Sequence, residues 1–376
     1  MSKNIKYDKG IRIICAVIFT TFSFIYIYVF QGELLALMQD YLSKGMTQNN
    51  TLITASLLTV LLVLLQWFIN RAAKLHGYWE ALSYIPSCAL LALLTDVNDG
   101  TMLYSTSKWL WGIPVCALLY IGVICLNRMV ANARKFSFCE ILWPNMLSFT
   151  ILFVLTAQIS NHAPAPHMEL SAWRHLHNND YEKILEIGHR SDDYNIELTA
   201  LRNLAMANSG QLGERLFHYP QPYGADGLIY NKHNKQSNTY GASEFYRHLG
   251  GNMPYGGEKG RPYCQRMATK NDSAIYRDLY LAALLLDKDL NTFVKETASL
   301  TSSSTAHHPA HYQEAWLLYN EQHPNTPIEF TPDSTVSSSF KAYRTLQREH
   351  KTNAIVAENL CRRKFSNTFW CYYDYN

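Results

Sequence analysis

The segment TLITASLLTVLLVLLQWFI, residues 51–69, decides the fold of this chain. It contains no charged side chain. A helix of this length rises about 30 Å, which matches the hydrocarbon thickness of a bilayer. A soluble helix of the same length needs a polar face, which this segment lacks. The segment therefore predicts a transmembrane helix.

Four further segments of the first 160 residues have the same apolar character, so we expect five spans. They cover residues 11–30, 51–69, 78–97, 109–127 and 141–159. The first follows a basic leader, as a signal peptide does, but its apolar stretch is too long and no small-x-small cleavage site follows it. The third is the least apolar, because it contains Glu80, Ser83, Pro86 and Ser87.

In this transmembrane domain, residues 1–160, the basic residues are concentrated on one of the two sides of the predicted membrane. Nine lie before or at the start of the first span, or after the second and fourth, namely Lys3, Lys6, Lys9, Arg12, Arg71, Lys74, Arg128, Arg134 and Lys135, and only Lys44 and Lys108 lie on the opposite side. This bias predicts a cytoplasmic N-terminus and, after five spans, an exported C-terminal domain. In the inner membrane of a bacterium this domain would be periplasmic. If the third span did not cross, the domain would be cytoplasmic.

The remaining residues, 161–376, are polar, with 22 Lys and Arg against 23 Asp and Glu. No basic patch stands out, which argues against nucleic acid as a partner. The bilayer is the expected partner of the first part. Of the eight cysteines, three (Cys264, Cys361 and Cys371) are expected outside the membrane. One disulfide among them is possible in an oxidising compartment, and the sequence leaves its pairing open.

Helical periodicity predicts helix pairs in this domain. Apolar faces flank three short turns, at residues 178–180, 210–212 and 287–289, and Asp193 or Asn195 is expected to cap the helix that precedes the second turn. The sequence predicts an all-α protein: a five-helix transmembrane bundle followed by a helical-repeat soluble domain.

These helix pairs resemble tetratricopeptide repeats, in which paired helices of about 34 residues stack side by side. The residues Asn203-Leu204-Ala205-Met206-Ala207 look like part of the first helix of such a repeat, and Asp180-Tyr181 and Asp289-Leu290 look like the turn before the second. The spans together with residues 203–221 and 368–375 also resemble uncharacterised bacterial multi-pass membrane proteins with repeat-like C-terminal domains. The first resemblance implies stacked helical hairpins, and neither implies an activity.

An irregular insertion, residues 219–263, interrupts the repeats. One short helix is expected in it, at residues 242–249. Its many aromatic residues argue against disorder and for an ordered loop folded against the helices. We expect Tyr219, Tyr223, Tyr246 and Tyr255 to act as aromatic anchors for a partner.

Three short stretches of the sequence bear on metal binding, phosphate binding and catalysis. His307, His308 and His311 are weak metal candidates; we expect a solvent-exposed helix N-terminus there, and no cofactor. Gly256–Arg261 lacks the Lys-Ser/Thr pair of a phosphate-binding loop. No nucleophile motif of the Gly-x-Ser-x-Gly type occurs.

The aromatic tail contains Trp370 and Tyr372. It is expected to pack as the closing cap of the helical array, with a docking strip for a partner as the alternative. The sequence thus favours a membrane-anchored scaffold that binds a protein or peptide in the cell envelope. The alternative is a membrane-associated enzyme of envelope lipid or glycan metabolism, with its site at the junction of the bundle and the soluble domain.

Overall fold

The computed structural model describes residues 2–43, 50–96, 106–130, 137–160, 164–188, 195–231, 241–271, 273–301 and 308–376. Every regular element in these residues is a helix, and none of them forms a strand, as an all-α protein requires. The chain divides into two compact units, Met1–Leu170 and Ser171–Asn376, which are called the first and the second unit below.

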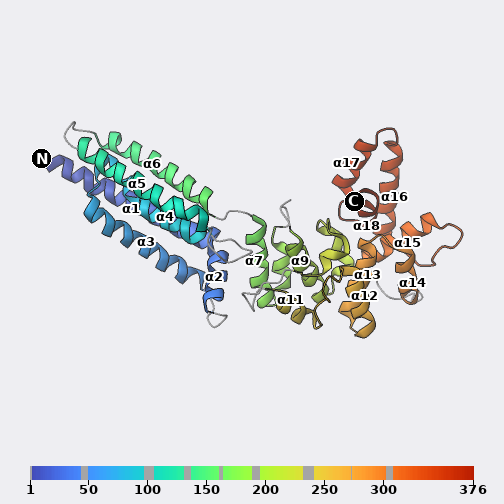
Figure 1. The fold of residues 1–376 in the computed structure, drawn as a ribbon. Coiled ribbons are helices and arrows are strands. Elements are labelled where there is room, and N and C mark those ends of the chain that lie inside the picture. The colour runs from blue at the N-terminus through green and yellow to red at the C-terminus, as the bar shows by residue number, and fades with distance from the viewer. Residues whose placement is uncertain are drawn as a thin grey trace. The chain divides into compact units, whose positions relative to one another are not determined.

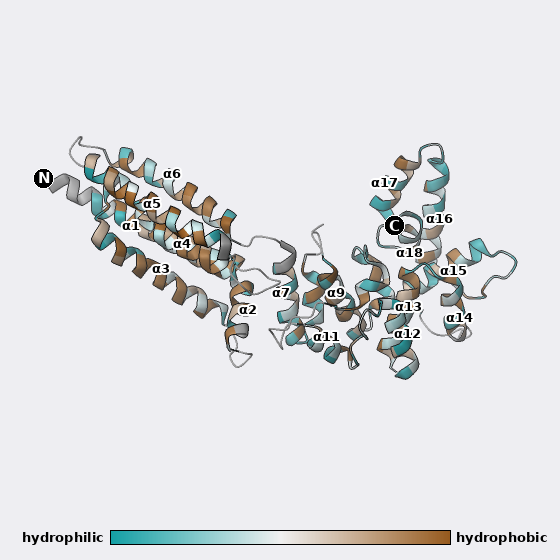
Figure 2. Ribbon diagram, in the orientation of Figure 1, coloured by the Kyte–Doolittle hydropathy of each residue, from teal (hydrophilic) through white to brown (hydrophobic). Residues whose placement is uncertain are grey.

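The first unit is a bundle of long apolar helices (Figures 1 and 2). Its elements are α1 (Ser2–Ile25), a π-helical turn (Tyr26–Phe30), α2 (Gly32–Ser43), α3 (Thr51–Ala73), two 3₁₀ turns (Gly77–Trp79 and Ala81–Tyr84), α4 (Ile85–Thr95), α5 (Thr106–Val130) and α6 (Phe138–Ile159). Four helical segments of the described chain are long and apolar enough to cross a membrane: Asp8–Phe30, Thr51–Ala73, Lys108–Met129 and Phe138–Ile159. They identify a multi-pass membrane protein.

The segment expected as the third span, residues 78–97, differs from the prediction because it is not one long α-helix. Its α-helical part, α4, has only 11 residues and is preceded by the two 3₁₀ turns. Pro86 lies in the first turn of α4, where its missing N–H is tolerated. The Ser83 hydroxyl donates to the Glu80 carbonyl at 2.6 Å, which supports the tighter turn before it. Val97 lies outside the described residues.

This broken segment nevertheless runs along α6 from Asn145 to its C-terminal end. Near the start of α6, the Asn145 side chain accepts a hydrogen bond from the Ala81 N–H (2.7 Å) and donates to the Gly77 carbonyl (2.9 Å). Beyond the end of α6, the Ser160 hydroxyl lies 2.7 Å from that of Thr95. Residues 77–95 and α6 are therefore parallel.

A contact with the start of α6 also gives the direction of α1. A Cβ on Gly10 would lie 3.9 Å from the Phe138 ring, so the start of α1 and the start of α6 share one end of the bundle. Side-chain bonds also tie the broken segment to α3: Gln66 donates to the Ser83 hydroxyl, and Ser87 to the Leu62 carbonyl, both at 2.7 Å. Polar side chains thus fix the middle of an otherwise apolar bundle.

The second unit consists of shorter helices (Figure 1). They are α7 (Pro164–His177, which begins in the first unit), α8 (Tyr181–Glu186), α9 (Ile196–Asn208), α10 (Leu212–Arg215), α11 (Ala242–Leu249), α12 (Gly260–Lys270), α13 (Ala274–Leu286), α14 (Leu290–Thr301), α15 (Ala310–Gln322), α16 (Ser334–Glu349), α17 (Ala354–Phe365) and α18 (Phe369–Tyr375), with 3₁₀ turns at Leu216–His218 and Gly224–Leu228. The predicted helix at residues 242–249 is confirmed as α11. Asn195 caps α9 by accepting from the Leu198 N–H at 2.7 Å.

Three helix pairs, α7–α8, α9–α10 and α13–α14, are joined by the same turn. Its central residue is left-handed in each case: Asn179 (φ 57°), Gly210 (φ 67°) and Lys288 (φ 59°). Each of these residues donates its N–H to the carbonyl three positions back, and the following N–H reaches back five positions. This arrangement satisfies the last carbonyls of the first helix and turns the chain directly into the second. The three turns lie where the sequence predicted them.

The cysteines of the second unit, Cys264, Cys361 and Cys371, are buried free thiols. Cys361 and Cys371 lie in one apolar cluster with Tyr343 and Trp370, whereas Cys264 lies in α12.

Candidate functional site

The predicted tyrosine anchors separate into buried and exposed residues. Tyr219 is 3 % exposed, and its hydroxyl donates to the Leu185 carbonyl at 2.9 Å. Tyr246 is 1 % exposed; its hydroxyl accepts from the Tyr230 N–H and donates to the Tyr230 carbonyl. Tyr223 is half-buried. Tyr255, by contrast, is 63 % exposed. Only Tyr255 of the four presents most of its surface to solvent.

The burial of these tyrosines follows from the way the insertion packs. The Gly227 carbonyl accepts from the Asn203 side chain of α9 at 2.9 Å, which draws residues 224–228 against that helix. The guanidinium of Arg202 lies 5.4 Å from the ring centroid of Tyr219 and covers that ring. The described part of the insertion is therefore ordered against the helices.

Tyr255 is held in place by an ion pair beneath it. The Arg266 guanidinium lies 4.1 Å from its ring centroid and donates to both carboxylate oxygens of Glu258, at 2.7 and 2.5 Å. Glu258 also accepts from the Tyr255 N–H at 2.9 Å. The hydrogen bonds from Arg266 lower the pKa of the Glu258 carboxyl, and the same contact raises the pKa of Arg266. A bidentate pair of this kind fixes the orientation of the aromatic ring.

The residues around Tyr255 combine apolar and cationic groups. Met253 is 38 % exposed, Lys259 and Lys270 are exposed, and the Lys270 ammonium lies 6.0 Å from the Tyr255 ring centroid. We call Met253, Tyr255, Lys259 and Lys270 the Tyr255 surface. An exposed aromatic ring beside cations suits contact with an acidic segment that also carries an apolar side chain.

The histidine candidates are placed differently from the prediction. His307 lies outside the described residues, and the His308 ring packs edge-on against Trp316 at 5.1 Å. His311 is 1 % exposed, which corrects the expected solvent-exposed helix N-terminus. Its Nδ1 lies 2.8 Å from Glu314, and its Nε2 accepts from the Phe217 N–H at 3.4 Å. Both ring nitrogens therefore have protein partners.

No metal-binding group emerges from this arrangement. Within the part of the chain that the structure describes, no three His, Cys, Asp or Glu side chains are grouped so that they could hold a metal ion.

The aromatic tail forms α18 and packs into the second unit. Trp370 is fully buried, and Tyr372 is half-buried, with its hydroxyl donating to the Leu286 carbonyl at 2.9 Å. The Phe369 N–H donates to Glu314 at 2.7 Å. The Lys288 ammonium donates to the Tyr373 carbonyl at 2.9 Å. The tail is thus attached to α13, α15 and the turn after α13.

Two features of this unit escaped the sequence analysis. Glu258 and Arg266 are eight positions apart and lie on different elements, so no helical spacing links them. Glu314 was not singled out from the sequence, although its carboxylate joins His311 to the tail. An acidic residue three positions after a histidine on one helix face was the available signal.

Comparison with known proteins identifies a protein family. A protein-family model, described as a family of unknown function (DUF6057), matches residues 99–253 and 260–376, more than half of the chain. No curated protein and no solved structure matches the chain.

Proposed function

The chain belongs to DUF6057, a family of unknown function, and we propose that it is a membrane-anchored scaffold whose second unit binds a protein or peptide partner in the cell envelope. The proposal has three parts: the bundle crosses the membrane five times, the second unit is a tetratricopeptide-like helical repeat outside the cytoplasm, and the Tyr255 surface contacts the partner. The exposed and fixed ring of Tyr255 is the observation that carries it.

The fifth crossing consists of residues 77–95. Its two ends are paired with Asn145 of α6 and with Ser160 at the end of α6, fifteen helical positions apart, which corresponds to a rise of about 22 Å, most of the hydrocarbon thickness. The hydrogen bonds at both of its ends, to Asn145 and to Ser160, support a full crossing parallel to α6. With five crossings, residues after Ser160 lie on the side opposite the N-terminus. The basic loops favour a cytoplasmic N-terminus, and hence a periplasmic second unit.

The repeat assignment is supported by the common turn of the three helix pairs. Identical left-handed positions at Asn179, Gly210 and Lys288 indicate that one helix–turn–helix unit occurs three times. Stacked helical pairs of this kind present extended surfaces that bind peptides and proteins.

The partner that we propose is an acidic segment carrying an apolar side chain. Tyrosine and arginine are common at the energetic centres of interfaces. Lys259 and Lys270 supply positive charge beside the ring, while Arg266 is already neutralised by Glu258. A rigid aromatic side chain loses little conformational freedom on binding.

A topology experiment tests the first part. Alkaline phosphatase, active only outside the cytoplasm, and green fluorescent protein, active only inside it, are fused in turn after Asn376 and, as an internal control, after Val130. We expect phosphatase activity after Asn376 and fluorescence after Val130. Phosphatase activity after Val130 together with fluorescence after Asn376 is the pattern of four crossings and would contradict the five-crossing arrangement.

A site-directed crosslinking experiment tests the binding surface. A photoreactive amino acid is placed at position 255 in living cells, and at Ile355, which is 73 % exposed on α17, as the matched control. We expect one discrete protein adduct from position 255, weakened about tenfold when Lys259 and Lys270 are replaced by glutamate, and no such adduct from position 355. Equal adduct yields at both positions would show that the Tyr255 surface is not the binding site. An adduct yield that the two glutamate substitutions do not change would contradict it as well.

A further inference from the structure

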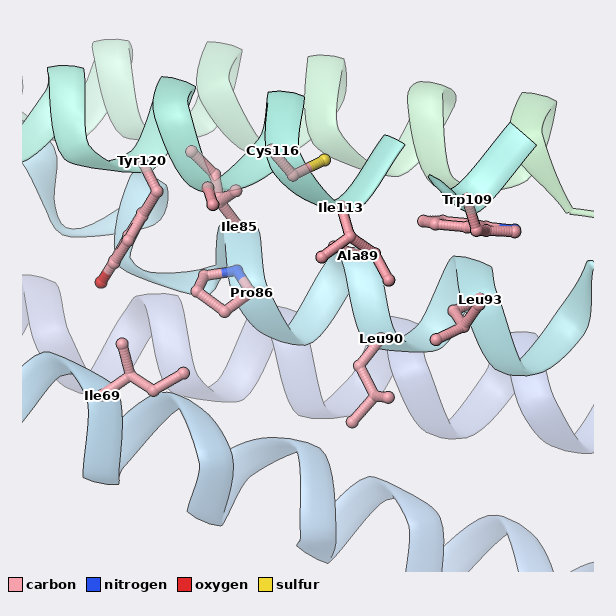
Figure 3. A pocket seen from close by; sticks show the side chains of 11 residues that line it. Ile69, Ile85, Pro86, Ala89, Leu90, Leu93, Trp109, Ile113, Cys116 and Tyr120 are labelled. Carbon is pink, nitrogen blue, oxygen red and sulfur yellow. The ribbon is translucent and has the colours of Figure 1, made fainter. Parts of the chain in front are cut away.

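An apolar cavity of about 320 Å³ lies between α4 and α5 in the first unit (Figure 3). Ala89 and Leu93 line it from α4, Ile113 and Cys116 line it from α5, and Ile69 of α3 lies at its lower edge in the view. Its size is at the lower end of the range for small-molecule sites, about 300–1,000 Å³. Because α4 and α5 are membrane helices in the proposed arrangement, its natural occupant is a hydrocarbon chain.

The two ends of the cavity are marked by aromatic residues. Trp109 lies at one end and Tyr120 at the other, and both are nine-tenths buried (Figure 3). They are eleven helical positions apart on α5. That separation corresponds to about 17 Å, roughly half of the 30 Å hydrocarbon core, which is the depth of one leaflet. The cavity thus matches the length of a single acyl chain.

At the Tyr120 end, the buried hydroxyl group of this tyrosine makes no hydrogen bond within the described residues. A buried hydroxyl without an acceptor costs free energy, and in hydrocarbon no water relieves it. An ester oxygen of a lipid entering at this end would supply the acceptor.

The same end of the bundle is cationic. Tyr120 packs in one cluster with Ala73 and Leu75, and the Asn127 side chain donates to the carbonyl of Lys74 at 3.5 Å. Three exposed cations lie beyond this end, each within two residues of Ala73 or Asn127: Arg71, Lys74 and Arg128. No carboxylate within the described ranges forms an ion pair with any of them. A phosphate group is the complementary partner for such a cluster.

The Trp109 end differs in charge. The Trp109 indole donates to Asp96 at 2.8 Å, and the Lys108 ammonium lies 4.0 Å from the same carboxylate. The cation at this end is therefore already paired, which leaves the Tyr120 end as the side that attracts an anionic head group.

We propose that the cavity between α4 and α5 binds one acyl chain of an anionic glycerophospholipid. The phosphate lies among Arg71, Lys74 and Arg128, an ester oxygen accepts the Tyr120 hydroxyl proton, and the chain extends toward Trp109. This site is separate from the partner surface of the second unit and does not depend on it.

The test uses the full chain in nanodiscs that contain phosphatidylglycerol with a diazirine midway along one acyl chain. After irradiation, adducts are mapped by mass spectrometry. We expect adducts on Ile113, Cys116 and Leu93 to exceed those on Leu118 by about tenfold, because Leu118 is 68 % exposed and does not line the cavity.

Variants separate specific binding from contact with bulk lipid. Ala89→Phe fills the cavity and is expected to lower the cavity adducts about tenfold, whereas Leu118→Phe leaves them unchanged. Replacing Arg71, Lys74 and Arg128 by glutamine is expected to lower them similarly, while Lys108→Gln has no effect. These three charges are exposed, so this variant remains informative if Ala89→Phe fails to fold.

Two results would overturn the proposal. One is adduct yield on the cavity residues no higher than on Leu118. The other is a disulfide between the Cys116 residues of two chains that forms in place of lipid adducts, since it would identify a second copy of the chain as the occupant.

Discussion

The carboxylate of Glu314 accepts a hydrogen bond from the backbone N–H of Phe369 at 2.7 Å, and so joins α15 to the C-terminal tail. The same oxygen, Oε2, lies 2.8 Å from Nδ1 of His311. Glu314 is 5 % exposed, so neither donor could find water in its place. One buried carboxylate therefore holds both the candidate histidine and the tail.

Replacing Glu314 by alanine is expected to release the tail. The change leaves two buried donors without an acceptor, at a cost of about 3 kcal/mol in the free energy of unfolding. Hydrogen exchange of the full chain measures the result: amides 369–375 should lose protection. Glu329→Ala, on an exposed side chain, is the control and should leave the exchange unchanged. Unaltered protection of the tail in Glu314→Ala would contradict the role of this contact.

A second prediction concerns Gly260, the first residue of α12. A Cβ at this position would lie 1.9 Å from the Ala225 carbonyl oxygen, and the Gly260 N–H donates to Asp226 at 2.8 Å. Backbone atoms cannot move aside as a flexible side chain can. Gly260→Ala should therefore destabilise the protein by about 3 kcal/mol or more.

Gly256 offers a matched control for this substitution. A Cβ there would meet nothing within 4 Å, and Gly256 is not among the positive-φ glycines. Gly256→Ala should change the free energy of unfolding by no more than about 0.5 kcal/mol. Thermal unfolding of both full-length variants measures the difference, and equal melting temperatures would show that the insertion near Ala225 adjusts freely.

Local signals in the sequence were sufficient to predict the helix pairs. Gly210 and the Asn-Asn-Asp run at residues 178–180 mark turns because their residues tolerate left-handed backbone or end helices. Lys288 has no such preference, yet it is also left-handed. Its turn was still predicted, because the apolar periodicity on both sides of it fixed where the helices end.

Burial of the tyrosines could not be predicted in the same way. Tyr246 and Tyr255 belong to one Tyr-rich insertion, but one is buried and the other exposed because of contacts with distant residues. Tyr246 bonds to the backbone of Tyr230, and Tyr255 is held by Arg266 on α12. The 3₁₀ turns before α4 were missed for a similar reason. Apolar composition predicts that a segment lies in the membrane, but it does not show where the helix is interrupted. The turns depend on hydrogen bonds made by Ser83 and by Asn145 of α6.

Acid should loosen the Tyr255 loop. The folded-state pKa of Glu258 is lowered by Arg266, so the pair contributes stability above the unfolded carboxyl pKa of about 4.3 and loses it as pH falls through the lower folded-state pKa. Protection of the Tyr255 amide, which donates to Glu258, is therefore expected to fall below about pH 4. Hydrogen exchange corrected for the intrinsic rate at each pH measures it.

Glu258→Gln removes the titrating group from this loop. The variant should show weaker protection of the Tyr255 amide at neutral pH and no further loss in acid. A wild-type acid transition that persists in Glu258→Gln would assign the pH dependence to another carboxyl group.

The thiols of the second unit are expected to resist alkylation in the native state. Burial raises the pKa of Cys371 to about 11 and also raises those of Cys264 and Cys361. With a pKa near 11, only about one thiol in a thousand is ionised at pH 8, and the thiolate is the reacting form. Iodoacetamide should therefore label these three cysteines only after unfolding. Peptide mapping by mass spectrometry distinguishes the sites. Rapid labelling of native Cys371 would show that its apolar cluster is open to the reagent. Recovery of a Cys361–Cys371 disulfide would show that the two thiols are oxidised. Either result would contradict the prediction.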